Sequence, residues 1–210
     1  MKVVCISDTH EKHEGLEVPD GDILIFAGDC SMVGSSEALH RFNEWLGKLP
    51  HEHKFWTYGN HEWTCDPNNR NYCSGYEKII TNGKQLNGNG AEVDGFKLWG
   101  SPMAPRFHGW AFGLEAYETF RYWRHIPENT DVLITHGPPR GIMDQNGIGE
   151  HCGCPNLTER VQQIKPRVHV FGHIHTQYGV EERDGTRYVN ASVLDDRYEL
   201  VREAIVLEVD

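Results

Sequence analysis

The chain has 210 residues, of which 38% are hydrophobic and 24% are charged, and its formal net charge is −11. This length and composition predict one soluble globular domain over residues 1–210. The negative charge argues against duplex nucleic acid as a partner, because duplex binders carry a basic surface. The sequence contains no membrane-spanning apolar run and no signal-peptide core, so we expect a cytoplasmic protein without membrane contact. The spacing of its six cysteines favours reduced thiols.

Three short apolar runs in the first third of the chain predict buried strands over residues 2–6, 22–27 and 53–58. A helix is expected over 35–49, where apolar residues share one face, Ser35 or Ser36 caps the start and Pro50 ends the pattern. The strand–helix–strand order favours a parallel arrangement. Polar residues follow all three strands, namely Asp8 with His10, Asp29, and Asn60 with His61 and Glu62.

The middle of the chain gives weaker signals. We expect a short helix over 75–80, a surface loop over 82–90, and a hairpin that turns at Asp94-Gly95. The irregular stretch 103–113 contains Arg106, His108 and Trp110, which are candidates for the wall of a substrate pocket. The alternative that this loop only packs over the edge of the sheet stays open.

The last third repeats the pattern of strands that end in polar residues. Strands are expected over 131–135, before His136, and over the run that begins at Val168, before His173 and His175. Helices are expected over 114–125 and 156–165, the second begun by a capping box of Asn156 and Glu159. A hairpin over 178–190 and a strand over 203–209 complete the chain. About ten strands and three or four helices favour two packed sheets covered by helices, an α/β (α+β) sandwich.

Five of these strand ends together form a candidate metal site. Their shared feature is oxygen or imidazole nitrogen, and the set comprises Asp8, His10, Asp29, Asn60, His136, His173 and His175. Seven ligands are too many for one tetrahedral ion and sufficient for two ions of higher coordination. Asp29, on a central strand, is the natural carboxylate to bridge them. The lack of cysteine in the set disfavours a structural zinc site.

The motifs resemble those of the calcineurin-like metallophosphoesterase superfamily, in order and over nearly the whole chain. They are Asp8-Thr9-His10, Gly28-Asp29, Gly59-Asn60-His61-Glu62, Thr135-His136-Gly137 and Gly172-His173-Ile174-His175. A looser similarity, through Gly100-Ser101-Pro102, Gly109-Trp110 and His136-Gly137-Pro138-Pro139, is to the metallophosphoesterase-domain-containing group of compact phosphodiesterases. The family fold is a two-sheet sandwich flanked by helices.

The resemblance implies a ligand set for each of two divalent ions. One ion would be held by Asp8, His10, Asp29 and His175, and the other by Asp29, Asn60, His136 and His173. Manganese is placed first, with iron, zinc, nickel or cobalt as alternatives. A hydroxide that bridges the ions would attack phosphorus, and His61 would protonate the leaving group.

The expected function is therefore that of a phosphodiesterase acting on small phosphodiesters such as cyclic nucleotides. The Asp-Arg extension that follows the second motif of phosphoprotein phosphatases is missing after Asp29, so an acidic partner for His61 is not identified. Glu62 is expected to fix a turn or to bond a ligand's second nitrogen. Asn190 and Ser192 are left as residues that either border the site or form a plain turn. The alternatives are a small-molecule phosphomonoesterase, a nuclease for short substrates, and a non-catalytic nucleotide- or metal-binding module.

Overall fold

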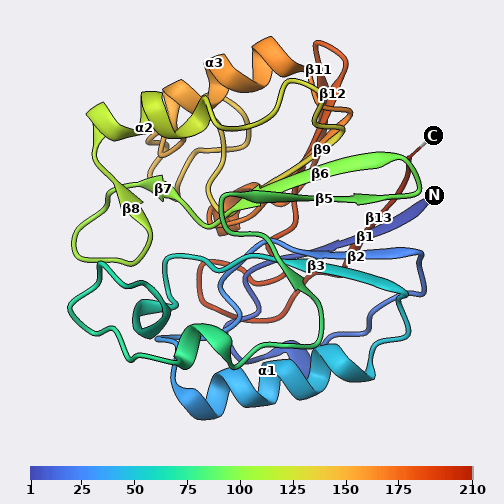
Figure 1. Ribbon diagram of the computed structural model, residues 1–210, viewed down its shortest axis with the longest axis vertical. Coiled ribbons are helices and arrows are strands. Elements are labelled where there is room, and N and C mark those ends of the chain that lie inside the picture. Colours follow the sequence, from blue (N-terminus) through green and yellow to red (C-terminus); the bar gives the residue numbers. More distant parts are fainter. Residues whose placement is uncertain (210) are drawn as a thin grey trace.

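The computed structural model describes residues 1–209 and shows two β-sheets packed face to face (Figure 1). The first sheet has the order β13-β1-β2-β3-β4, with β1 (Lys2–Ile6), β2 (Ile23–Phe26), β3 (His53–Trp56), β4 (Lys84–Gln85) and β13 (Ile205–Glu208). The second has the order β11-β12-β10-β9-β6-β5, with β5 (Asn89–Val93), β6 (Phe96–Ser101), β9 (Val132–Thr135), β10 (Val168–Phe171), β11 (Gly179–Arg183) and β12 (Thr186–Asn190). A two-stranded pair joins β7 (Ala104–Pro105) and β8 (Gly113–Leu114). The predicted two-sheet sandwich is confirmed.

Helices cover the outer face of each sheet (Figure 1). Helix α1 (Ser36–Lys48) packs on the first sheet, while α2 (Ala116–Trp123) and α3 (Pro155–Ile164) pack on the second. Short 3-10 helices occur at His13–Gly15, Trp63–Cys65, Tyr76–Lys78 and His175–Gln177. Within residues 1–209, every helix is too short or too polar to cross a bilayer.

The core explains why the strand sequences are apolar without interruption. In β1, Val3 and Cys5 face the other sheet, whereas Val4 and Ile6 pack under α1 with its Phe42. Both faces of this strand are therefore buried, which removes the alternation of polar and apolar residues that a half-exposed strand would show.

Parallel pairing aligns the strand ends and so fixes where the polar residues meet. Strands β1, β2 and β3 run parallel, and their last residues are paired as Ile6↔Phe26 and Phe26↔Trp56. In the other sheet, β9 and β10 also run parallel. Because the carboxyl ends of parallel strands lie at one edge, the segments after these five strands gather at one end of the sandwich.

Two local predictions are confirmed in detail. The Ser35 hydroxyl accepts a hydrogen bond from the Ala38 amide at 3.2 Å, which caps α1. The β5–β6 hairpin turns at Asp94 and Gly95, whose φ angles of 50° and 82° are those of a type I′ turn.

Two other predictions are wrong. The segment 82–90 is not only loop, because β4 lies within it and pairs with β3. Helix α3 begins at Pro155 with Cys154 at its N-cap and no side-chain cap, so the expected box of Asn156 and Glu159 does not form. Proline suits the first helical position because it has no N–H to satisfy there, and it shifts the helix start by one residue.

A buried histidine makes stability depend on pH. His169, in β10, is inaccessible, and burial lowers its pKa to about 3. The Thr135 hydroxyl donates to the Gly137 carbonyl at 2.7 Å and accepts from His169 Nε2 at 2.9 Å, so Nδ1 is the unprotonated nitrogen and has no partner. The folded protein thus keeps this ring neutral, whereas the unfolded chain protonates it below about pH 6.5.

We therefore expect the metal-free protein to lose about 2 kcal/mol of unfolding free energy through His169 alone between pH 7 and pH 5, since only the unfolded state gains the proton. A His169→Leu variant should lack this part of the loss. Urea unfolding at both pH values, with a chelator present for both proteins, measures the difference. An identical pH dependence in the two proteins would contradict the assignment.

Candidate metal centre

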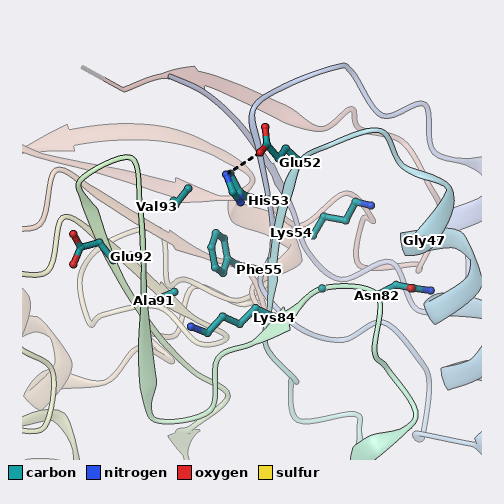
Figure 2. A pocket seen from close by; sticks show the side chains of 11 residues that line it. Gly47, Glu52, His53, Lys54, Phe55, Asn82, Lys84, Ala91, Glu92 and Val93 are labelled. Carbon is teal, nitrogen blue, oxygen red and sulfur yellow. Dashed lines mark ion pairs between the residues drawn. The ribbon is translucent and has the colours of Figure 1, made fainter.

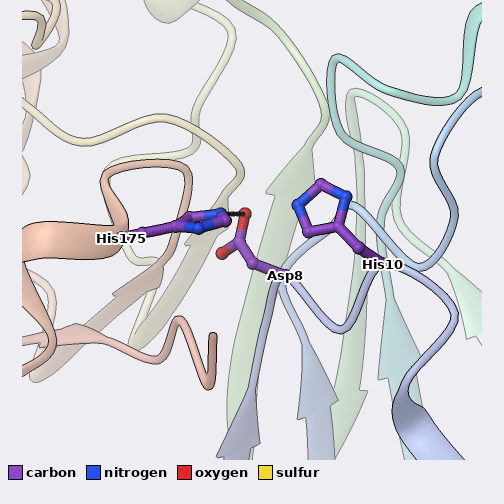
Figure 3. Close-up of side chains that lie close together, drawn as sticks. All are labelled: Asp8, His10 and His175. Carbon is purple, nitrogen blue, oxygen red and sulfur yellow. Dashed lines mark ion pairs between the residues drawn. The ribbon is translucent and has the colours of Figure 1, made fainter. Parts of the chain in front are cut away.

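The segments after the five strands bring carboxylates and imidazoles into three overlapping groups. In each group the candidate ligand atoms all lie within 4.8 Å of one another; the groups are Asp8 with His10 and His175, His10 with Asp29 and His61, and Asp29 with His136 and His173. Figure 3 shows the first, with the Asp8 carboxylate between the two rings. His10 and Asp29 each belong to two groups, so the groups form one continuous centre.

The backbone reaches this arrangement through left-handed turns and not through continued strand geometry. Strand β1 ends at Ile6, and Asp8 and His10 have φ angles of 56° and 38°. Asp29 and His173 are also left-handed, with φ of 57° and 68°. Asp8 and His10 therefore do not converge by continued alternation along a strand. Such φ values are uncommon outside glycine and concentrate at functional sites.

Glycines of the motifs leave room for the ligands. A Cβ on Gly172 would lie 2.0 Å from Asp8 Oδ2, and a Cβ on Gly59 would lie 2.2 Å from Asp29 Oδ1. Both distances are far below van der Waals contact. These two positions accept only hydrogen because the carboxylates pack directly against the main chain.

Main-chain carbonyls orient four of the imidazole rings. In each case Nδ1–H donates to a carbonyl oxygen, and the pairs are His10 with Ser31 at 3.2 Å, His61 with Met32 at 2.8 Å, His136 with Ala27 at 2.9 Å and His175 with Asp195 at 2.9 Å. A carbonyl can only accept, so Nδ1 carries the proton in all four rings. Nε2 of each ring therefore faces the centre, where the neutral ring can bind a metal through its lone pair and the protonated ring can donate a proton.

The two carboxylates remain ionised. Burial raises the pKa of Asp8, but the hydrogen bond and charge of His175 outweigh it and hold the pKa below its usual value. For Asp29, burial is again opposed, chiefly by His136, and the pKa is lowered well below normal. Asp8 Oδ2 also accepts from the Ser192 hydroxyl at 2.6 Å and the His173 amide at 2.9 Å.

The donor set fits divalent cations. His10 Nε2 is buried, has no hydrogen-bond partner, and lies 3.7 Å from Asp29 Oδ2. A cation between them would satisfy both the unprotonated nitrogen and the carboxylate, and burial lowers the pKa of His10 to about 4, so a proton does not take that place. Nitrogen and oxygen ligands without sulfur suit manganese, iron, zinc, nickel or cobalt.

Asn60 and His136 also meet beside Asp29. His136 Nε2 lies 2.7 Å from Asn60 Oδ1 and 3.3 Å from Asp29 Oδ2. Burial alone would lower the pKa of His136, but Asp29 raises it to about 9. The His173 ring packs edge-on against His136 with centroids 5.0 Å apart. The structure thus brings all seven residues predicted as metal ligands together at one centre.

His61 lies at the edge of the centre, with Nε2 4.0 Å from Asp29 Oδ2. Its backbone amide donates to Asp29 Oδ1 at 2.9 Å, and the Trp110 ring covers it at a centroid distance of 4.4 Å. The partner of Nδ1, which the sequence did not identify, is the Met32 carbonyl and not an acid.

Glu62 is fully buried and joins the second and third motif loops. Its carboxylate accepts from the Ser31 amide and hydroxyl at 3.0 and 2.8 Å and from the Gly59 amide at 2.8 Å. Burial, followed by the charge of Asp29, raises its pKa to about 7. Glu62 therefore fixes the turn, which is the first of the two roles expected for it.

The three predicted pocket residues have different positions. Trp110 lies against His61, whereas the exposed Arg106 side chain contacts Glu115 at 2.6 Å and the Gly113 carbonyl at 2.9 Å. The exposed His108 ring packs on Phe107. The structure brings Trp110, but neither Arg106 nor His108, into contact with the metal centre.

Sequence reasoning missed one residue and left two undecided. Tyr198 packs on His10 and His175, with centroid distances of 4.8 and 5.2 Å. Ser192 supports Asp8, and Asn190 donates to the Ile174 carbonyl at 2.9 Å. Tyr198 belongs to none of the five motifs, and the one available signal was its place after a strand end.

A cavity beside the centre, about 200 Å³ in volume, is lined by Asn146, Gly147, His173, Ile174, His175, Thr176, Asp196 and Tyr198. A larger cavity of about 390 Å³ lies elsewhere, at the edges of β3, β4 and β5 (Figure 2). Its lining includes Phe55, Lys54 and Lys84 but none of the candidate ligands. The smaller cavity is therefore the one that adjoins the metal centre.

Comparison with known proteins identifies the family of the chain. A family model described as Calcineurin-like phosphoesterase matches residues 1–177. The chain belongs to that family, and its clustered Asp and His residues support a metal-dependent phosphoesterase.

Among curated relatives, the human Metallophosphoesterase domain-containing protein 1 is 39% identical over 99% of this chain and 70% of its own length. The UPF0046 protein K07C11.7 of Caenorhabditis elegans is 40% identical over 91% of this chain and 69% of its own length. The crystal structure of TT1561 of Thermus thermophilus aligns with a TM-score of 0.64 and 13% identity, over 98% of this chain and 97% of that one. That likeness concerns the fold alone.

Proposed function

We propose that the protein is a dinuclear metal-dependent phosphodiesterase for small phosphodiesters. The observation that carries the proposal is Asp29, which shares a ligand group with His136 and His173 and whose Oδ2 also lies 3.7 Å from His10 of the Asp8 group. A carboxylate in this position suits two ions better than one.

The proposed ligands are those implied by the resemblance: Asp8, His10, Asp29 and His175 for one ion, and Asp29, Asn60, His136 and His173 for the other. Manganese is the proposed ion, with iron, zinc, nickel and cobalt as alternatives that the same nitrogen and oxygen atoms accept. When bound, the ions would supply an activated water and neutralise phosphate charge.

The side chains around the ions have separate tasks. Asp29 Oδ1 is held by the His61 amide, which couples the third motif loop to the central carboxylate. His61 is the proposed general acid: the Met32 carbonyl holds Nδ1–H, so the protonated ring would donate its second proton from Nε2, which faces the reaction space, and return to the neutral Nδ1–H form. Trp110 packs over the same ring and limits its motion and its contact with water.

The charge of the site favours a diester over a monoester. In the described part of the chain, the residues in contact with the centre are acidic, imidazole, amide, hydroxyl or aromatic, and Arg106, which does not contact the centre, is paired with Glu115. A dianionic monoester usually needs arginine or lysine to neutralise it, whereas a diester carries a single charge. Two metal ions beside two carboxylates suffice for the smaller charge.

The test is a paired assay on metal-stripped protein reloaded with manganese. We expect bis(4-nitrophenyl) phosphate to be hydrolysed with a kcat/KM at least about tenfold above that of 4-nitrophenyl phosphate, and an Asp29→Ala variant to lose both metal and turnover. Preference for the monoester would show a phosphomonoesterase. Hydrolysis of neither ester by protein whose metal content is verified would leave a binding module.

A further inference from the structure

The cavity beside the metal centre lies away from His61. Four rings form a chain of contacts from Trp110 through His61 and His10 to His175, with successive centroid distances of 4.4, 4.4 and 5.3 Å. The cavity of about 200 Å³ adjoins His175, at one end of this chain, and neither His61 nor Trp110 lines it. A leaving group that is protonated by His61 would therefore lie outside the cavity.

Tyr198 forms part of the wall of the cavity on the side of the metal centre, together with His173 and His175. Its half-buried ring packs on His10 and His175 and also lines the cavity. None of the described residues hydrogen-bonds its hydroxyl, whereas the hydroxyls of Ser192 and Thr176 have partners. The ring is accordingly fixed in place while its polar end is available to a ligand.

A constrained turn holds Tyr198 in this position. Its φ angle is 61°, in the left-handed region. Its amide donates to the Asp195 carbonyl at 2.9 Å, and the Asp195 carboxylate accepts from the amides of Arg197 and Glu199, both at 2.9 Å. The same Asp195 carbonyl accepts from His175, so one turn positions both the candidate ligand and the tyrosine. A strained backbone that is this well supported is typical of functional sites.

We infer that this cavity binds the second alcohol of a phosphodiester, the one that remains on phosphorus, and that Tyr198 is the residue that determines specificity for it. The inference rests on the proposed phosphodiesterase function. It assigns the two ester groups to opposite ends of the ring chain, with the leaving group beside His61 and Trp110 and the retained group beside His175 and Tyr198.

The polar groups that line the cavity determine which kind of alcohol it can bind. The Asn146 amide is occupied by its own loop, where its oxygen accepts from the Ile148 and Glu150 amides. Thr176 donates to the Gln145 carbonyl at 2.7 Å and so presents lone pairs, as Asp196 does. These acceptors favour a ligand that donates hydrogen bonds, and the Tyr198 hydroxyl can either donate to it or accept from it. No lysine or arginine of the described chain lines the cavity, which disfavours a second phosphate.

The part of the retained alcohol that enters the cavity is thus small, neutral and hydroxyl-bearing, such as glycerol or the sugar of a nucleoside. The volume of about 200 Å³ is below that of a pocket for a drug-sized ligand, which supports a small group.

Three substrates that all release 4-nitrophenol isolate the retained group. They are thymidine 5′-(4-nitrophenyl phosphate), bis(4-nitrophenyl) phosphate and 4-nitrophenyl phosphate. We expect the wild-type protein, loaded with manganese, to prefer the thymidine ester, and Tyr198→Ala to lower the kcat/KM ratio of that ester to the monoester at least about tenfold. Tyr198→Phe keeps the ring and removes the hydroxyl, so it measures the contribution of the hydroxyl alone. Arg197→Ala, in the same turn with an exposed side chain, is the matched control and should keep the wild-type ratio.

A binding measurement supplies a readout that does not need turnover. Calorimetry with thymidine 5′-monophosphate and with inorganic phosphate compares ligands with and without the retained alcohol. Tyr198→Ala should weaken binding of the nucleotide and leave binding of phosphate nearly unchanged.

The outcomes distinguish the inference from the proposed function. Equal losses by Tyr198→Ala on all three substrates, with unchanged nucleotide binding, would overturn the cavity assignment and leave Tyr198 as a support for His10 and His175. Preference for bis(4-nitrophenyl) phosphate over the thymidine ester would overturn the requirement for a hydroxyl-bearing alcohol. No hydrolysis by the wild-type protein would overturn the proposed function, whereas selective loss of nucleotide binding in Tyr198→Ala would still support the cavity assignment.

Discussion

Replacing His61 by glutamine is expected to lower kcat for a phosphodiester with an alkyl leaving group by about 10²- to 10⁴-fold, the usual contribution of a general acid. An alkoxide is a poor leaving group and needs a proton, which Nε2 is positioned to donate because the Met32 carbonyl fixes Nδ1. Metal binding should be unaffected, because the hydrogen bond to Asp29 comes from the residue 61 amide and survives replacement of the side chain.

The dependence on the leaving group separates acid catalysis from other roles. With a 4-nitrophenyl diester, whose leaving group needs little protonation, His61→Gln should cost much less activity than with an alkyl diester. Metal content measured on the same samples tests the second part of the expectation. His40→Gln, on the exposed face of α1, is the matched control. Equal losses with both leaving groups, or loss of metal, would contradict the assignment of His61 as the acid.

Replacing Gly172 by alanine should weaken metal binding by at least about 10- to 100-fold, the range found when groups that hold a metal ligand are disturbed. The added Cβ would lie 2.0 Å from Asp8 Oδ2 and 2.2 Å from the Ser7 hydroxyl, so Asp8 must move. Gly59→Ala should act in the same way on Asp29, at 2.2 Å. Both effects arise from a single methyl group that carries no charge.

Calorimetric titration of the stripped proteins with manganese measures the loss. Gly15→Ala is the matched control, because its Cβ would meet only Leu200 at an ordinary 3.5 Å. Thermal unfolding of the metal-free proteins shows whether the variants fold before metal is added. Wild-type affinity for two ions in Gly172→Ala would show that Asp8 is not a ligand.

The sequence allowed the sandwich and the approximate location of the centre to be predicted because both depend on local patterns. Apolar runs that end in Asp8, Asp29 or His136 mark strands, and parallel strands place their ends together. The roles assigned to individual ligands remain predictions. The positions of those residues could be anticipated, although the left-handed turns at Asp8 and His10 could not, since they depend on contacts with distant loops.

What could not be predicted comes from contacts without a side-chain signature. The Met32 carbonyl, which holds His61, is a main-chain atom that every residue possesses. Ser192 and Tyr198 reach the centre only because the segment after β12 folds back beside the first motif. The capping box expected in α3 does not form, because the proline before Asn156 changes which residue begins that helix. A capping box instead starts α2, where it is formed by Glu115 and Glu118.

The four carbonyls that orient the imidazole rings have a consequence for how the family can diverge. Substitution at Ala27, Ser31, Met32 or Asp195 changes a side chain but cannot delete the oxygen that receives the proton. Substitutions at these four positions therefore preserve the orientation of the rings, provided that the loops keep their backbone conformation. Substitutions can then change the surfaces that contact the substrate without misaligning the metal ligands. The same metal centre can therefore be combined with different substrate specificities.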